Sequence, residues 1–316
     1  MSEKILVIGA AGQIGTELVL TLRQSKGADN VIAADLKEPS EEVLAGGKFV
    51  QLDILDEPAV RSVINDHRIT EVYLLAALLS ATAEKNPMFA WKLNMDGLFN
   101  ILNIAKEGII KKVFWPSSIA IFGPSSPKEK TPQTSIMEPT TVYGISKQAG
   151  ERWCEYYFRQ YGVDVRSIRY PGLISYKSLP GGGTTDYAVD IYYEALEKAS
   201  FTCFLDENMK LPMMYMEDAI RATIELMDTP IENVKTRSSY NISGMSFSPK
   251  EIAQSIQHHI SDFEINYSID YRNKIAETWP NSISDSNARE DWNWKAQYDL
   301  DEMTKNMLEN LAKQIS

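Results

Sequence analysis

The sequence has only two cysteines, no long apolar run and fewer basic than acidic residues. Cys154 and Cys203 lie far apart without the spacing of metal ligands, which indicates buried thiols in a reducing compartment. No apolar run approaches the roughly 18 residues of a membrane span, so we expect no membrane partner. The 32 basic and 43 acidic residues give a net charge of −11, and the lack of a basic patch argues against a nucleic-acid partner. Because the first predicted strand begins at Lys4, we expect no leader segment and a cytoplasmic protein.

Short apolar runs alternate with helical patterns through the first half of the 316-residue chain. The predicted strands cover residues 5–8, 31–34, 49–52, 72–77, 113–116 and 165–170, and the predicted helices cover 12–26, 58–66, 87–107 and 141–161. Strands that alternate with helices form βαβ crossovers and a mostly parallel sheet covered on both faces. The predicted fold class is therefore α/β, with a Rossmann-type doubly wound parallel sheet.

A glycine-rich turn follows the first strand and contains Gly9, Gly12, Gln13, Ile14 and Gly15. Its glycines allow a tight turn and the close approach of a pyrophosphate, and the helix that starts there supplies N–H groups and a positive dipole end. Asp35, at the end of the second strand, can accept hydrogen bonds from both ribose hydroxyls and would repel a 2′-phosphate. The sequence therefore predicts NAD, rather than NADP, as the cofactor.

Further residues at strand ends extend the predicted cofactor site. Asp53 and Ile54 follow the third strand, where they can meet the adenine, although Asp53 could instead cap the next helix. Ala76 and Ala77 close the fourth strand, and their small side chains let the backbone lie close to the cofactor. Ser80 follows them and either reaches the substrate or serves as a turn residue.

Tyr143 and Lys147 form the predicted proton-transfer site. Their four-residue spacing puts both side chains on one helical face, where the lysine would lower the pKa of the phenol. The strand that ends in Ser117 and Ser118 should bring those hydroxyls to the carboxyl edge of the sheet. We predict that Tyr143 takes the proton of an alcohol substrate while hydride passes to the nicotinamide, that Lys147 holds the ribose, and that Ser118 orients the substrate oxygen. Ser117 would lie beside the cofactor.

The pattern changes after about Tyr170, where strands become sparse and the flexible segment 180–183 appears. Such a region usually forms a smaller lobe over the carboxyl ends of the strands. We predict a NAD-binding domain over residues 1–170 and a mainly substrate-binding lobe over 171–316, with some elements returning to the sheet. The glycines at 181–183 permit a lid that closes over the substrate. Asp299 and Glu302 predict a capped helix from 300 to about 313.

These motifs together resemble the extended short-chain dehydrogenase/reductase family, whose members share a glycine-rich turn, an acidic ribose ligand and a Ser/Tyr/Lys site. Segment 285–292 is similar to the helix-then-Trp signature of that family's second lobe. Segments 116–124, 169–174 and 181–188 are similar to the family's short-chain L-threonine 3-dehydrogenases. The resemblance implies a NAD-dependent enzyme that oxidises the 3-hydroxyl of L-threonine to a ketone, giving 2-amino-3-ketobutyrate without a metal.

The resemblance also implies site residues. A small amino-acid substrate would be contacted by Ser80, Ser118, Tyr143, Thr184, Thr185 and Trp279. Trp279 would shield the site or simply pack in the core. The predicted cofactor site also includes Leu75, Asn94 and Tyr170.

Other functions remain open. A nucleotide-sugar (UDP-hexose) 4-epimerase or dehydratase commonly carries an Asn that binds the diphosphate at the place of Gly172, so a sugar nucleotide would lose a ligand here. A redox-sensing binding module that keeps the cofactor without catalysis would be expected to lack Tyr143 or Lys147. The long helices 87–107 and 141–161 favour a symmetric homodimer.

Overall fold

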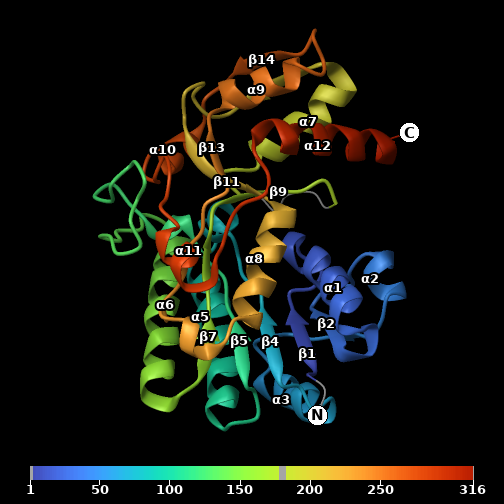
Figure 1. The fold of residues 1–316 in the computed structure, drawn as a ribbon, viewed down its shortest axis with the longest axis vertical. Helices are drawn as coiled ribbons and strands as arrows, with labels where there is room; N and C mark the ends of the chain where they lie inside the picture. The colour runs from blue at the N-terminus through green and yellow to red at the C-terminus, as the bar shows by residue number, and fades with distance from the viewer. Residues whose placement is uncertain (1–2, 178–182, 316) are drawn as a thin grey trace.

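Six parallel strands form the central sheet, in the order β3-β2-β1-β4-β5-β7 (Figure 1). They are β1 (Ile5–Ile8), β2 (Val31–Asp35), β3 (Phe49–Gln51), β4 (Glu71–Leu74), β5 (Lys112–Phe114) and β7 (Asp164–Arg166). The structure is a computed structural model that describes residues 3–177 and 183–315. Because β1 and β4 at the centre of the sheet are buried along their whole length, both faces need cover. The predicted α/β fold with a doubly wound parallel sheet is confirmed.

Helices cover both faces of this sheet. One face packs against α1 (Gln13–Lys26), α2 (Glu41–Ala45) and α8 (Met216–Asp228). The other packs against α3 (Glu57–Asp66), α5 (Pro87–Lys106) and α6 (Val142–Tyr161), with the short α4 (Ser80–Ala83) beside α5 and α6. Each face thus has its own hydrophobic core. Three 3-10 turns are η1 (Ala28–Asn30), η2 (Ile119–Ile121) and η3 (Ile231–Asn233).

Three strands differ from the prediction. The fifth ends at Phe114, so Ser117 and Ser118 belong to a separate strand. The fourth ends at Leu74, because the N–H groups of Leu75 and Ala76 both donate to the Ile8 carbonyl, at 2.8 and 3.1 Å, and turn the chain toward the glycine-rich turn. Ala76 and Ala77 therefore follow the strand and do not close it. The predicted strand 165–170 divides at Ser167, whose hydroxyl donates to the Ser239 hydroxyl at 2.9 Å.

The residues beyond that division, β8 (Ile168–Tyr170), leave the central sheet and form a second small one. There β8 lies between β6 (Ser117–Ser118) and β12 (Tyr240–Asn241). This arrangement places the two serines beside a strand that leads into the second half of the chain.

The second half builds a lobe at the end of the molecule opposite the amino terminus (Figure 1). Its sheets are β13-β11-β9, from β13 (Met245–Phe247), β11 (Leu211–Tyr215) and β9 (Gly172–Ile174), and β10-β14, from β10 (Ser200–Cys203) and β14 (Glu264–Tyr267). Its helices are α7 (Tyr187–Lys198), α9 (Pro249–Gln257), α10 (Tyr271–Ala276) and α12 (Leu300–Ile315). Helix α11 (Ser286–Trp292) instead packs with α1 and α8 in the core on one face of the central sheet. The predicted cap of α12 is confirmed, since Glu302 N–H donates to Asp299 at 2.9 Å and Asp299 N–H donates back to Glu302 at 3.1 Å.

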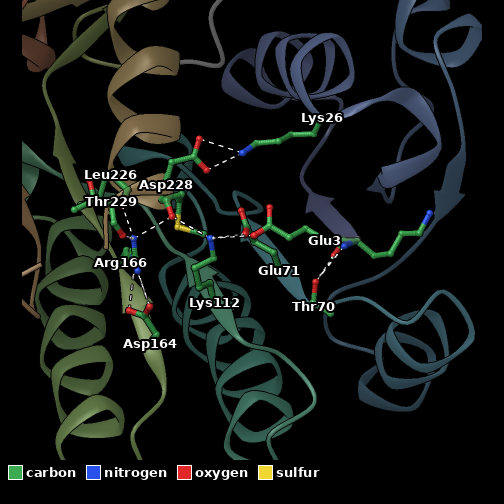
Figure 2. A network of polar contacts seen from close by, with 12 residues as sticks. Glu3, Lys26, Thr70, Glu71, Lys112, Asp164, Arg166, Leu226, Asp228 and Thr229 are labelled. Carbon is green, nitrogen blue, oxygen red and sulfur yellow. Dashed lines mark hydrogen bonds and ion pairs between the residues drawn. The ribbon is translucent and has the colours of Figure 1, made fainter. Parts of the chain in front are cut away.

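Helix α8 returns from the lobe to the central sheet, where buried charges hold its carboxyl end (Figure 2). Arg166 donates to the carbonyls of Leu226, Met227 and Thr229, at 2.7, 3.0 and 2.5 Å, and pairs with Asp164 at 2.8 Å. The guanidinium thus satisfies carbonyls that a helix end leaves unpaired. No helix in residues 3–177 or 183–315 has the length and apolar character to cross a membrane.

Candidate active site

A cleft of about 220 Å³ lies where the glycine-rich turn, β6, α6 and the lobe meet. Of the predicted residues, it is lined by Gly9, Gly12, Gln13, Ile14, Gly15, Leu75, Ala77, Ser80, Ser117, Ser118, Tyr143, Lys147, Tyr170, Thr184, Thr185 and Trp279. The fold therefore brings the predicted cofactor turn, proton-transfer pair and substrate contacts into one cavity. Gly181 and Gly182 of the predicted lid lie outside the described residues, and Gly183 lines the cleft.

The glycine-rich turn is shaped by close contacts that exclude side chains. Gly9 has a φ of +96°, and a Cβ there would lie 2.6 Å from the Ala76 nitrogen. A Cβ at Gly15 would lie 2.0 Å from the Gly9 carbonyl oxygen. The helix α1 that starts at Gln13 has no acidic residue in its first turn, which leaves its positive end free for an anion.

Asp35 lies beside this turn at the end of β2. Its carboxylate accepts the N–H groups of Ala11 and Lys37, each at 3.0 Å. These bonds hold the carboxylate at the turn, and each oxygen retains a lone pair for a ribose hydroxyl. Asp35 itself is not among the described residues that line the cleft.

Four other predicted cofactor residues, Asp53, Ile54, Ala76 and Asn94, also lie outside the described cleft lining. Asp53 accepts the Leu55 N–H at 2.9 Å, and the cap of α3 is Asp56, so the alternative of Asp53 as helix cap is wrong. Ile54 is buried. Asn94 exchanges hydrogen bonds with the backbone of Leu78, at 2.9 and 3.3 Å, and donates to the Ser146 hydroxyl at 3.1 Å. It ties the loop after β4 to helix α6.

Tyr143 lies in the first turn of α6, which Thr141 caps by accepting the Gly144 N–H at 3.1 Å. Burial raises the pKa of the phenol to about 12, and a hydrogen bond with Ser118 opposes that rise. The net direction is upward, because the effect of burial is larger than that of the hydrogen bond with Ser118.

Lys147 is buried, with its ammonium 2.6 Å from the carbonyl oxygen of Pro116, to which it donates. It lies 4.4 Å from the centre of the Trp115 ring and 5.6 Å from that of the Tyr143 ring. Burial lowers the pKa of the ammonium to about 7, while the charges of the Cys154 and Glu151 side chains act in the opposite direction. The lysine can therefore hold or release a proton near neutral pH.

The two serines of β6 have different partners. Ser118 bonds Tyr143, and its Oγ also accepts the Ala120 N–H at 3.2 Å. Ser117 is buried and donates to the Glu151 carboxylate at 2.6 Å. Ser118 is thus the serine whose hydroxyl is next to the phenol, and Ser117 connects β6 to α6 from behind.

The substrate side of the cleft combines hydroxyls with one large aromatic ring. Ser80 begins α4 and is buried, and Thr184 is 1% exposed with no hydrogen-bond partner for its hydroxyl among the described residues. Trp279 is buried, lines the cleft and also belongs to the lobe's core. The Gln13 side-chain nitrogen, across the cleft, likewise lacks a partner within the described part of the chain. Unpaired buried polar atoms on both walls fit a polar ligand.

Sequence reasoning missed several residues that line the cleft: Leu79, Pro116, Ile119, Pro171, Leu173 and Asp186. Pro116 contributes a backbone carbonyl, which no side-chain motif reveals. Glu151 was also missed as the partner of Ser117. Its place four residues after Lys147 was an available signal, because that spacing extends the same helical face.

The donor set suits a dinucleotide and not a metal. The cramped glycine-rich turn, the open helix end and the Asp35 carboxylate fit a pyrophosphate and a ribose diol. Within residues 3–177 and 183–315, no group of three His, Cys, Asp or Glu side chains could hold a metal ion. Cys154 and Cys203 are buried free thiols, and burial raises the pKa of both.

A fold and a site of this kind define a NAD-dependent oxidoreductase. Residues 5–243 match the model of the NAD dependent epimerase/dehydratase family, and the chain belongs to that family. An uncharacterized epimerase/dehydratase of Staphylococcus saprophyticus is 48% identical over 309 residues, which cover 97% of this chain and 96% of that protein.

Several solved structures that share more than 48% sequence identity with this chain are L-threonine dehydrogenases. The holo form of a GalE-like L-threonine dehydrogenase from Cupriavidus necator is 56% identical, with a TM-score of 0.95 over 98% of this chain and 99% of the other. A monomeric L-threonine 3-dehydrogenase from a metagenome, in its apo form, is 51% identical, with a TM-score of 0.95 over 99% of this chain and 100% of the other. The predicted resemblance to short-chain L-threonine 3-dehydrogenases is confirmed.

Proposed function

We propose that this chain is a L-threonine 3-dehydrogenase, which converts L-threonine and NAD to 2-amino-3-ketobutyrate, NADH and a proton. One observation carries the proposal: the Ser118–Tyr143 pair and Lys147 share a cleft of about 220 Å³ with the hydroxyls of Ser80 and Thr184. The cleft therefore joins a proton-transfer group to polar contacts on the scale of an amino acid. The solved relatives named above support the choice of substrate.

Each group in the cleft has its own role in the proposed reaction. NAD supplies the hydride acceptor. As the phenolate, Tyr143 takes the proton of the 3-hydroxyl, while Ser118 orients that oxygen and Lys147 holds the nicotinamide ribose. Ser80, Thr184 and Thr185 bind the polar groups of the amino acid, and Trp279 excludes water from one side.

The cofactor is held by the glycine-rich turn and the strand ends around it. The residues assigned to it are Gly9, Gly12, Gln13, Ile14, Gly15, Asp35, Asp53, Ile54, Leu75, Ala76, Ala77, Asn94, Ser117, Tyr143, Lys147 and Tyr170. Residues 1–170 form the NAD-binding domain, and 171–316 form the mainly substrate-binding lobe. We place the enzyme in the cytoplasm, in threonine catabolism, as a homodimer.

Gly172 disfavours the nucleotide-sugar alternative. A Cβ at this position would lie 2.3 Å from the Met213 sulfur and 2.8 Å from the Thr185 Cβ. No Asn fits there to bind a diphosphate, because the space is already filled by the lobe. The same packing sets Thr185 beside Gly172 at the cleft.

Formation of NADH by the purified protein with L-threonine, L-serine and D-threonine tests the proposal. Preferential turnover of L-threonine is expected. UDP-glucose and UDP-galactose are tested separately for interconversion, and silence with threonine together with sugar interconversion would replace the dehydrogenase by the epimerase.

A further inference from the structure

A buried ion pair lies directly behind the proton-transfer residues. Glu151 is 0% exposed and Arg169 is 1% exposed. Arg169 donates to both carboxylate oxygens of Glu151, at 2.9 and 2.8 Å, and Ser117 donates to the first of these oxygens at 2.6 Å. These three hydrogen bonds compensate the buried carboxylate for its loss of water. Removal of either Glu151 or Arg169 would leave the other as a buried charge without its partner.

Glu151 extends the face of α6 that carries Tyr143 and Lys147. The three side chains follow at intervals of four residues, and each of them meets the segment 116–118. Tyr143 bonds Ser118, Lys147 donates to the Pro116 carbonyl, and Glu151 accepts from Ser117. Three consecutive turns of the helix thus fasten the segment that presents the Ser118 hydroxyl.

Arg169 is in turn fixed from the far side. Its guanidinium donates to the Gln133 carbonyl at 2.8 Å and to the Asn241 side chain at 3.0 Å. Asn241 lies on β12 and donates onward to the Thr131 carbonyl at 3.2 Å. The ion pair therefore joins the catalytic helix to strands β8 and β12 through fully buried contacts.

We propose that Glu151 and Arg169 are positioning residues, which hold segment 116–118 against α6 and set the electrostatic balance that decides how Tyr143 and Lys147 share their proton. The role in turnover rests on the proposed dehydrogenase function. The effect on the Tyr143–Lys147 pair does not depend on that function and can be measured without a substrate.

The charged and titratable groups around Lys147 are few. On α6 they are Tyr143, Glu151 and the Cys154 thiol, and β8 adds Arg169. Segment 115–118 contributes uncharged groups, and α5 contributes the neutral amide of Asn94. Glu84, beyond α4, accepts the Val142 N–H at 2.8 Å at the start of the helix. The negative charge of Glu151 favours the ammonium of Lys147, and Arg169 balances that charge.

Removal of the Glu151 charge and removal of the Arg169 charge should shift the titration of the Tyr143–Lys147 pair in opposite directions. E151Q leaves Arg169 unbalanced, and the extra positive charge should shift the titration of the Tyr143–Lys147 pair toward lower pH by about one unit. R169Q leaves Glu151 unbalanced and should shift it toward higher pH. In the double variant E151Q/R169Q, which lacks both charges, the titration should lie between those of the two single variants. In the single variants, kcat with L-threonine should fall about tenfold or more through misplacement of Ser118.

The experiment combines two readouts on the full-length protein. The first is the pH profile of kcat with L-threonine. The second is NMR of protein labelled at tyrosine Cζ, with Tyr143→Phe used to assign the Tyr143 resonance, which follows its ionisation without substrate. If wild-type protein does not oxidise L-threonine, the proposed function fails, and the NMR titration still decides the role of the ion pair.

The chain offers a matched control in the buried pair Asp164–Arg166 (Figure 2). Neither of its residues lines the described cleft. Arg166→Gln should lower the melting temperature and leave the Tyr143 titration in place. The proposal is overturned if E151Q and R169Q lower stability as Arg166→Gln does, with no displacement of their titrations in opposite directions.

A conservative variant separates charge from placement. Glu151→Asp keeps the carboxylate charge but shortens its reach to Ser117. It should lower kcat while the Tyr143 titration stays near its wild-type position. If E151Q or R169Q does not fold, the same measurements are made on Glu151→Asp and on the neutral double variant E151Q/R169Q. An unchanged kcat in Glu151→Asp would contradict the positioning role.

Discussion

The ammonium of Lys147 donates to the carbonyl oxygen of Pro116 at 2.6 Å, so the helix that carries the proton-transfer pair is bonded to the segment between β5 and β6. A single neutral acceptor does not offset the removal of the charge from water, and the pKa of the lysine is lowered to about 7. The site therefore keeps a cation at a cost to the stability of the fold.

Lys147→Met should stabilise the cofactor-free protein while it abolishes turnover. The folded-state pKa of about 7 lies below the ordinary value of 10.5, so between these pH values the unfolded chain binds more protons. The destabilisation by Lys147 is complete below pH 7 and vanishes above about pH 10.5. The melting temperature of the variant should exceed that of wild type by about 3 °C at pH 7. Differential scanning calorimetry from pH 6 to 10 should show that this difference in melting temperature decreases as the pH rises. Lys111→Met is the control, because Lys111 is exposed and its substitution should give a difference that does not change with pH. A constant difference for Lys147→Met as well would refute the lowered pKa of Lys147.

Tyr143→Phe should lower kcat with L-threonine by at least about a thousandfold, because it removes the group that accepts the substrate proton. Affinity for NAD, measured by calorimetric titration, should change less than about threefold, since the ring remains. Tyr157→Phe on the same helix is the control, because that hydroxyl bonds Asn103 at 2.7 Å outside the described cleft lining. Comparable activity in both variants would assign the base elsewhere.

Asp35→Ser should raise the preference for NADP over NAD, measured as the ratio of kcat/KM values, by about tenfold or more. The carboxylate is held beside the glycine-rich turn by the Ala11 and Lys37 N–H groups, where it would repel a 2′-phosphate. Asp53→Ser is the comparison variant, since a role at the adenine would weaken both cofactors equally. If Asp35→Ser also weakens both equally, Asp35 does not set the preference.

The sequence predicted those parts of the site that depend on local order. The glycine-rich turn comes directly after a strand, and Tyr143 and Lys147 are spaced as on one face of a helix. Both motifs can therefore be recognised from residues that are close in the sequence. The Ser117–Glu151 bond joins residues 34 positions apart, and the Lys147–Pro116 bond ends on a backbone carbonyl. No pattern in a single sequence encodes such long-range contacts. The early end of β4 at Leu74 has the same origin, because the Ile8 carbonyl draws the chain away from the sheet.

Gly172→Asn should remove threonine turnover without creating sugar interconversion. Its Cβ would meet the Met213 sulfur and Thr185, so the lobe must shift at the cleft, and we expect a loss of several degrees in melting temperature. Gly162→Asn is the control, because Gly162 has a φ of +71°, which Asn tolerates, and nothing lies within 4 Å of its missing Cβ. Interconversion of UDP-glucose and UDP-galactose by Gly172→Asn would contradict the argument against a sugar nucleotide.

Helices α5 and α6 lie side by side, and both expose large apolar side chains. These are Met88, Phe89 and Trp91 of α5 and Trp153, Tyr156 and Tyr161 of α6. Trp153 is 41% exposed, and its ring packs against Phe99 of α5 at 5.0 Å, so it lies where the two helices meet. Apolar patches of this kind commonly pair with the same patch of a second copy.

Trp153→Glu should therefore convert the proposed homodimer to a monomer, because an unpaired carboxylate would be buried at the centre of the interface. Light scattering coupled to size-exclusion chromatography at micromolar protein gives the mass directly. Tyr271→Glu, at an aromatic residue of the lobe that is 59% exposed, should leave the dimer intact. A wild-type protein that elutes at the monomer mass of 35.6 kDa would show that this surface has no self-association role, and the apolar side chains would then need another explanation.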